Sequence, residues 1–276
     1  MLRPGLIGSL AAVLLIATTA ARAHDATQYP DLRGQWVRVG GGHFDPSRPS
    51  GRGAQPPFTP EYQAIFEQVL TSLEAGGQEH NPTTACLPPG MPRAMAALEP
   101  MEIIVSAETT YILLSYFNEF RRVHTDGRNW PDSLKASAFA GYSIGRWEDT
   151  DGDGRYDTLA VETRGMKGPR VFEASGMPLH KDNQTVVKER ISLDKANPNV
   201  LHNELTTIDN ALTRPWTIKR SYRRAQNPNW IEYVCTENNQ DVFIGKEGYF
   251  LSSDGFLMPT KKDQPPPDLR YFQPPE

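Results

Sequence analysis

Three consecutive segments decide the fold of this 276-residue chain: QTVVKERISL (184–193), VLHNELTTI (200–208) and PWTIKRSYRR (215–224). Each segment is rich in β-branched and aromatic residues, which fit the half-buried surface of a pleated strand. The connections between them are short, so the strands are expected to pair antiparallel. This part of the chain therefore predicts a continuous antiparallel sheet.

The same composition extends toward the N-terminus and a little beyond residue 224. It predicts further strands at 32–39, 101–106, 109–117, 119–125, 141–149, 156–164 and 229–235. About ten strands without interleaved helices are typical of an all-β protein. The two architectures that fit are an antiparallel β-barrel and a β-sandwich.

One helix is predicted, over residues 60–75. Thr59 supplies an N-cap, Pro60 suits the first helical position, and Glu61 places an acid in the first turn. Apolar residues then follow at helical spacing, and Gly76-Gly77 ends the pattern; they are Tyr62, Ile65, Phe66, Val69, Leu70 and Leu73. The helix is expected to cover the sheet with one face.

Residues 1–23 have the features of a secretory signal. Arg3 provides the positive charge, Leu10 to Ile16 the apolar segment, and Ala21-Arg22-Ala23 a small-x-small cleavage site. We therefore expect a periplasmic or secreted protein. No later apolar segment is long enough to span a membrane as a helix, so stable membrane insertion is not expected.

The expected mature chain is one β-rich domain at 24–258, followed by a proline-rich tail at 259–276. The formal net charge of the whole chain is −4. A net negative charge argues against nucleic acid and against anionic membrane surfaces as partners. The expected partner is a small molecule.

Cys86 and Cys235 are the two cysteines and lie far apart in the sequence. In an exported chain two such thiols are expected to form a disulfide. A catalytic thiol is the alternative, and it would leave the other cysteine without a role.

The segment DTDGDGRYD (149–157) groups acidic residues around a glycine turn. Asp149, Asp151 and Asp153 occupy the first, third and fifth positions of a calcium loop, and Asp157 the ninth. An EF-hand requires a glutamate at the twelfth position and flanking helices, and here the twelfth residue is Ala160. We expect structural calcium at a hairpin tip, with a solvated acidic turn as the alternative.

Five blocks of the sequence resemble a widespread group of secreted bacterial proteins that has no established activity. They are CLPPGMPR (86–93), RRVHTDGR (121–128), GYSIGRWE (141–148), TRPWT (213–217) and EYVCTENN (232–239). The resemblance covers most of the mature chain and implies export but no mechanism. A short turn is usual in that group where the acidic loop stands, which makes calcium an accessory here. Gly34-Gln-Trp36 also resembles the first-strand signature of lipocalins and favours a barrel.

The densest polar cluster is Arg122, His124, Asp126 and Arg128. On a strand, Arg122 and His124 share one face, and Asp126-Gly127 forms the following turn. Two guanidiniums beside a carboxylate and an imidazole can hold an anionic ligand or tune a general base. The alternative is a strand end whose arginine is tied to a neighbouring acid.

Other candidates are the aromatic residues Tyr142, Trp147 and Trp216, which can line a ligand pocket, and Glu189, an acid that can point into a barrel. His24, the first residue after the expected cleavage, can chelate copper through its amine and imidazole together with a second histidine. The sequences typical of elbow-type serine hydrolases, zincins and nucleotide enzymes are absent.

Three functions remain open from the sequence. The first is a barrel that binds a small apolar or amphipathic ligand through Arg122, Arg128 and the three aromatic residues. The second is a periplasmic lyase, isomerase or hydrolase that uses His124, Asp126 or Glu189 as acid or base. The third is a structural cell-envelope protein without a pocket.

Overall fold

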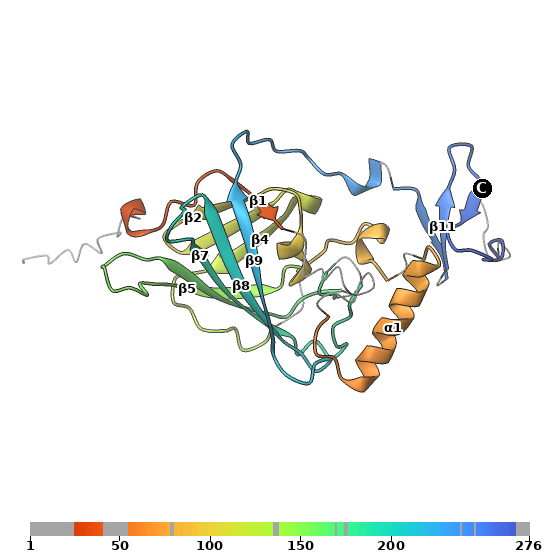
Figure 1. Ribbon diagram of the computed structural model, residues 1–276, viewed down its shortest axis with the longest axis horizontal. Helices are drawn as coiled ribbons and strands as arrows, with labels where there is room; N and C mark the ends of the chain where they lie inside the picture. The colour runs from red at the N-terminus through yellow and green to blue at the C-terminus, as the bar shows by residue number, and fades with distance from the viewer. Residues whose placement is uncertain are drawn as a thin grey trace, which may run out of the picture.

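The strands that the sequence predicts close into a barrel, seen on the left of Figure 1. The computed structural model describes residues 25–40, 55–77, 80–134, 138–168, 170–173, 176–237, 239–245 and 247–268. Within these ranges nine strands form the barrel: β1 (Gln35–Val39), β2 (Met101–Val105), β3 (Thr109–Leu114), β4 (Glu119–His124), β5 (Tyr142–Glu148), β6 (Thr158–Arg164), β7 (Val186–Leu193), β8 (Val200–Ile208) and β9 (Trp216–Arg224). The all-β prediction is confirmed, and of the two architectures the barrel is the one observed.

The sheet is antiparallel except at one seam. β1 pairs with both β2 and β9 and so closes the ring, and all neighbours are antiparallel except β4 and β5. β5 runs parallel to β4, with Val123 beside Ser143 and His124 beside Ile144, so both strands begin at the same end of the barrel. The expectation of a wholly antiparallel sheet was therefore wrong at this seam.

The strand predicted at 229–235 does not form. This segment lies along one end of the barrel, where the Ile231 carbonyl accepts a hydrogen bond from Ser115 Oγ at 2.9 Å. The Tyr233 carbonyl accepts one from Asn118 Nδ2 at 2.8 Å. These side-chain donors replace the ladder bonds that a strand would make.

A small second sheet follows, which the sequence did not predict. It consists of β10 (Asp241–Ile244), β11 (Glu247–Leu251) and β12 (Leu257–Pro259). It lies beyond the C-terminal end of the helix (Figure 1), where the backbone N–H of Lys262 donates to the Ala75 carbonyl at 3.2 Å. The expected boundary between domain and tail at residue 259 thus falls at the end of β12.

The predicted helix is confirmed as α1 (Pro60–Glu74), with the Thr59 hydroxyl accepting from the Tyr62 N–H. Its buried face forms a second apolar cluster outside the barrel with Phe172, Ala211 and Leu212. Trp216, at the first position of β9, contacts this cluster and the barrel core alike. The helix therefore covers the barrel end at which β9 begins.

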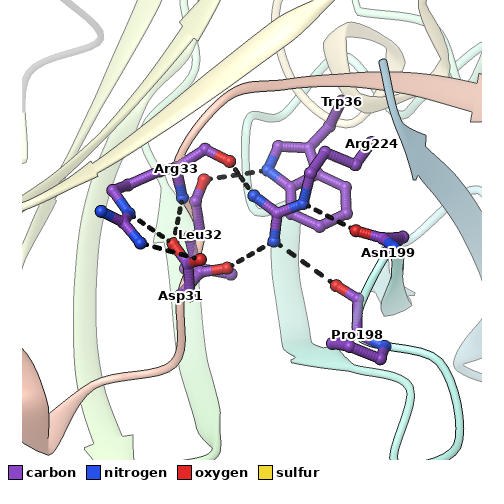
Figure 2. Close-up of polar contacts among 7 residues, drawn as sticks. All are labelled: Asp31, Leu32, Arg33, Trp36, Pro198, Asn199 and Arg224. Carbon is purple, nitrogen blue, oxygen red and sulfur yellow. Dashed lines mark hydrogen bonds and ion pairs between the residues drawn. The ribbon is translucent and has the colours of Figure 1, made fainter. Parts of the chain in front are cut away.

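The other end of the barrel is closed by Trp36 and Arg224, shown in Figure 2. Trp36 is fully buried, and its indole N–H donates to the Leu32 carbonyl at 3.0 Å. The Arg224 guanidinium lies 4.4 Å from the centre of the Trp36 ring system and donates to the carbonyls of Arg33, Asp31 and Pro198. One side chain thus joins the N-terminal segment, the β7–β8 connection and the core. We call this the Trp36 end.

The opposite end is filled by residues 90–96, which we call the plug. Met91 and Met95 are buried in the barrel core, and the Tyr222 hydroxyl donates to the Met95 carbonyl at 2.6 Å. Gly90 has a φ of +59°, and a Cβ at this position would lie 2.7 Å from the Phe139 carbonyl oxygen. Only glycine fits this turn without displacing the backbone that it contacts.

The predicted disulfide is present between Cys86 and Cys235, with the two Cα atoms 5.6 Å apart. It links the segment leading into the plug with the chain that follows the barrel. No helix within the described ranges is long and apolar enough to cross a membrane. The predicted signal at 1–23 and the proposed copper ligand His24 lie outside the described residues.

Candidate functional site

Three adjacent strands place a polar residue between two apolar ones on the face that points into the barrel. The triplets are Val187-x-Glu189-x-Ile191 in β7, Leu201-x-Asn203-x-Leu205 in β8 and Ile218-x-Arg220-x-Tyr222 in β9; all nine side chains are buried. Because alternate residues of a strand share a face, this pattern places a polar layer inside an apolar core. Arg121 in β4 extends the layer across the barrel.

Arg121 and Glu189 form an ion pair in the interior. Arg121 Nη2 lies 2.5 Å from Glu189 Oε2 and Nη1 lies 3.2 Å from Oε1, and both side chains have no exposed surface. Asn203 Nδ2 donates to Glu189 Oε1 at 2.8 Å. Bidentate pairing is the strongest arrangement for a guanidinium and a carboxylate, and it offsets the cost of taking both charges out of water.

The layer continues through two hydroxyl groups. Arg121 Nη2 also donates to Thr163 Oγ1 at 3.4 Å, and Thr163 Oγ1 lies 2.7 Å from Ser143 Oγ. The ion pair is thus part of a network that spans β4 to β8 and holds its members in fixed positions.

Several buried polar atoms of this network and its surroundings have no hydrogen-bond partner in the described part of the chain. They are Arg38 Nε, Glu119 Oε1, Arg121 Nε, Asn203 Oδ1, Thr207 Oγ1 and Arg220 Nη1. Nearly all buried polar atoms in native proteins have a partner, which is either protein, ordered water or a ligand. Half of these atoms are arginine nitrogens, which require an oxygen acceptor.

Arg220 is one of the arginines whose buried nitrogen lacks an acceptor. Its side chain points into the barrel, and burial lowers the pKa of its guanidinium. Arg38 adds positive charge nearby and lowers that pKa further, although Tyr222, Glu173 and Glu189 act in the opposite direction. An anionic oxygen beside Nη1 would stabilise the charged form.

Glu119, the first residue of β4, is a buried acid beside the polar layer. Burial raises the pKa of its carboxyl to about 7, while the Gly90 N–H, which donates to Oε2 at 3.3 Å, and the charge of Arg121 act to lower it. The carboxyl therefore links the plug, through Gly90, to the inward face of β4.

This raised pKa predicts a pH dependence of stability. In the unfolded chain the carboxyl ionises near its ordinary pKa of 4.5, whereas in the folded protein it stays protonated up to about 7. The contribution of this group to the free energy of unfolding is therefore largest below pH 4.5. It falls by up to about 3 kcal/mol as the pH rises to about 7. Glu119→Gln, which mimics the neutral acid, is expected to remove that loss in urea unfolding at pH 4.5 and pH 8. The exposed Glu204→Gln is the control, and an unchanged pH dependence in Glu119→Gln would refute this assignment.

Methionines surround the same end of the barrel. Met91, Met95, Met101 and Met166 are each at most 2% exposed and belong to one core cluster. Met101 begins β2 and Met166 follows β6, so both lie at the end that the plug fills. Methionine side chains are flexible and fill irregular spaces, so this part of the core adapts its shape more easily than one built of branched residues.

The predicted cluster around His124 lies on the outer face of the barrel. Arg122 is exposed over the Phe120 ring, and His124 stacks on Tyr142 with ring centres 5.0 Å apart. Asp126 pairs with Arg128 at 2.6 Å, and hydrogen bonds from Arg128 lower the pKa of Asp126 to about 2. The side chain of Asp126 is thus held by its neighbour, as the alternative interpretation of a tied strand end anticipated.

Arg128 and the nearby Trp130 line a cavity of about 550 Å³ against the outer face of β5–β8. The exposed Glu204 lines the same cavity and therefore belongs to the outer face of β8. The remaining aromatic candidates lie elsewhere. Trp147 donates to Thr110 Oγ1 at 3.3 Å near the Trp36 end, and Trp216 lies at the opposite end.

The structure therefore distributes the predicted ligand-binding and catalytic residues over the outer face, the two ends and the interior of the barrel, and it does not join His124 to Glu189. Of the predicted set, only Glu189 belongs to the interior polar layer. Sequence reasoning missed Arg121, Asn203 and Arg220. The available signal was the recurrence of one polar residue between apolar ones in β7, β8 and β9, at equivalent inward positions.

The acidic loop connects β5 and β6 as predicted, and carboxylate oxygens of Asp149, Asp151 and Asp153 lie within 4.8 Å of one another. This cluster is able to hold a metal ion. Asp149 accepts hydrogen bonds from the N–H groups of Gly152, Asp153 and Gly154, which fixes the turn. Asp157 instead accepts from Thr150, and it is not among the three clustered residues.

Comparison of the chain with protein-family models and with curated proteins found no match. The resemblance to secreted bacterial proteins and to lipocalins therefore stays a prediction from the sequence.

Proposed function

We propose that this protein is an exported barrel that binds a small amphipathic molecule with an acidic, oxygen-rich group at the plugged end. The observation that carries the proposal is the set of buried arginine nitrogens without an acceptor: Arg38 Nε, Arg121 Nε and Arg220 Nη1. A carboxylate or a similar group supplies several acceptor oxygens at once and balances positive charge that burial makes costly.

The apolar part of the ligand would contact the methionines of the plug and its surroundings. Met91 and Met95 lie in the plug itself and belong to the barrel core. The proposal requires residues 90–96 to move and make room for the ligand between these methionines and the polar layer. The Trp36 end is closed by the buried indole and by Arg224, which donates to three backbone carbonyls. The ligand is therefore proposed at the plugged end, beside the polar layer.

The test compares two probes that differ only in their polar end, decanoate and decanol, by titration calorimetry. We expect decanoate to bind at least tenfold more tightly than decanol, and Arg220→Met to lose this preference. Arg223→Met is the matched control, because Arg223 follows in the same strand but is exposed on the outer face. Equal binding of the two probes, or equal loss in both variants, would exclude the proposed role of the arginines.

Export is the setting in which this function is proposed. The Cys86–Cys235 disulfide fits an oxidising compartment, and the sequence predicts a signal at 1–23. N-terminal sequencing of the protein from its own cells is expected to start at His24. A chain that starts at Met1 would contradict export by this signal.

The acidic loop is proposed to hold calcium as a structural ion, with Asp149, Asp151 and Asp153 as ligands. The loop is tied to the N-terminal segment, since Tyr156 N–H donates to the Gln28 carbonyl at 2.8 Å. Lys195 contacts Asp151 at 3.0 Å and partly offsets the acidic charge.

Calcium is therefore expected to raise the melting temperature of the protein, because a ligand that binds only the folded state stabilises it. Millimolar calcium should raise the midpoint by several degrees, and Asp151→Ala should abolish the effect. Glu204→Ala, an exposed acid far from the loop in sequence, should leave it intact. A midpoint that does not respond to calcium in the unmodified protein would rule the site out.

A further inference from the structure

A serine, a histidine and an aspartate form a hydrogen-bonded chain on the outer face of the barrel. His202 in β8 lies 2.9 Å from Ser221 Oγ through Nδ1 and 3.0 Å from Asp194 Oδ2 through Nε2. Ser221 is the cross-strand partner of His202 in β9, and Asp194 directly follows β7. Two neighbouring strands and the residue that follows a third thus contribute one member each.

The hydrogen bonds fix the roles of the two ring nitrogens. A carboxylate accepts but does not donate, so Nε2 carries the proton that is shared with Asp194. In the neutral imidazole, Nδ1 is then the acceptor for the Ser221 hydroxyl. The hydrogen bond that His202 donates lowers the pKa of the Asp194 carboxyl and keeps it ionised. A base within hydrogen-bond distance of a hydroxyl, oriented by a third group, is the arrangement that activates a serine nucleophile.

Asp194 is itself held in place. Its Oδ1 accepts from the N–H groups of Ala196 and Asn197, both at 2.9 Å, which leaves Oδ2 directed at the histidine. The orientation of the imidazole therefore rests on backbone donors and on the sheet, and not on a flexible side chain.

The strand around Ser221 supplies positive charge. Lys219 and Arg223 lie two residues before and after Ser221 in the same strand, share its face and are exposed. In the site that we infer, their charges stabilise an oxyanion beside Ser221 Oγ. A separate cavity of about 490 Å³ adjoins His202 and Asp194, and Ser221 is not among its lining residues.

We propose that Ser221, His202 and Asp194 form a nucleophilic site that cleaves small carboxylic esters. Ser221 Oγ attacks the ester carbonyl carbon and passes its proton to His202 Nδ1. The C–O bond of the ester breaks, and the leaving alkoxide takes that proton and departs as an alcohol. Water then attacks the acyl group on Ser221 with proton transfer through the same nitrogen, releasing a carboxylic acid and restoring the hydroxyl.

The Ser221 site faces outward, whereas Arg220 and Tyr222 point into the barrel, so the two sites are separate.

The test uses an uncharged alkyl fluorophosphonate, which forms a covalent adduct with an activated serine, on the full-length mature protein. Intact-mass measurement should show one adduct, and peptide mapping should place it on Ser221. Ser221→Ala should abolish labelling, and His202→Gln should slow it by about 100-fold or more.

Ser192→Ala is the matched control. Ser192 is the cross-strand partner of His202 in the strand on its other side, but His202 Nδ1 accepts its hydrogen bond from Ser221. Labelling and p-nitrophenyl acetate cleavage should be unchanged in this variant. An unlabelled wild-type protein, labelling that survives Ser221→Ala, or an equal loss in Ser192→Ala would overturn the proposal. Circular dichroism of each variant shows whether it has folded.

Discussion

Glu189→Ala is expected to lower the free energy of unfolding by about 3–5 kcal/mol. The substitution leaves the Arg121 guanidinium inside the barrel with no carboxylate, and neither side chain of the pair has any exposed surface. Asn203 also loses the acceptor for its amide. Urea unfolding at constant pH measures the loss directly.

A double variant separates the charge from the packing. Arg121→Met with Glu189→Leu replaces the pair by apolar side chains of similar size, and such replacements are often neutral or stabilising. We expect it to recover most of the stability lost in Glu189→Ala. A double variant as unstable as Glu189→Ala would contradict this account.

Trp36→Ala is expected to cost about 3–5 kcal/mol, because it removes a fully buried indole and leaves a cavity at the Trp36 end. The Arg224 guanidinium also loses the ring on which it lies. Arg224→Ala keeps the indole but removes the hydrogen bonds to three backbone carbonyls, and we expect a smaller cost of about 1–3 kcal/mol.

Arg223→Ala is the control for the second pair of variants, since this arginine is exposed on the outer face and should change stability by less than about 0.5 kcal/mol. Thermal unfolding at one pH and ionic strength compares all three. If Arg224→Ala proved as mild as Arg223→Ala, the closure of the Trp36 end would not depend on the arginine.

The parts of the fold that the sequence predicted correctly are those set by local pattern. Alternating β-branched residues marked β2 to β9, helical spacing after Thr59 marked α1, and two cysteines in an expected secreted chain indicated the disulfide. The parallel seam between β4 and β5 was not predictable in this way. It depends on where the chain between residues 125 and 141 runs, and no local preference specifies that path.

The candidate site shows the same limit more clearly. His124 and Arg122 share a face, as strand alternation predicts, but which face points inward depends on the register of the whole barrel. Val123 and Ile191 indicate the inward face, and the polar residues in phase with them are Arg121 and Glu189. The alternation of buried residues in the strands therefore contains the signal for the polar layer. The many polar residues around His124 lie on the outer face instead.

Two side chains that neighbour the polar layer also hold the plug in place. The Gly90 N–H donates to Glu119, and the Tyr222 hydroxyl donates to the Met95 carbonyl. Glu119 precedes Arg121 by two residues in β4 and Tyr222 follows Arg220 by two in β9, so each shares the inward face with an arginine of the polar layer. The same residues thus hold the plug and border the space proposed for the ligand. A ligand that displaces part of the plug would exchange these contacts for its own.

Native mass spectrometry of the protein purified from its own cells tests the central claim most directly. The account predicts that the wild-type protein retains a small organic acid, and that Arg220→Met, purified in the same way, does not. A wild-type protein without any bound molecule would contradict it, as would the same bound molecule in both proteins.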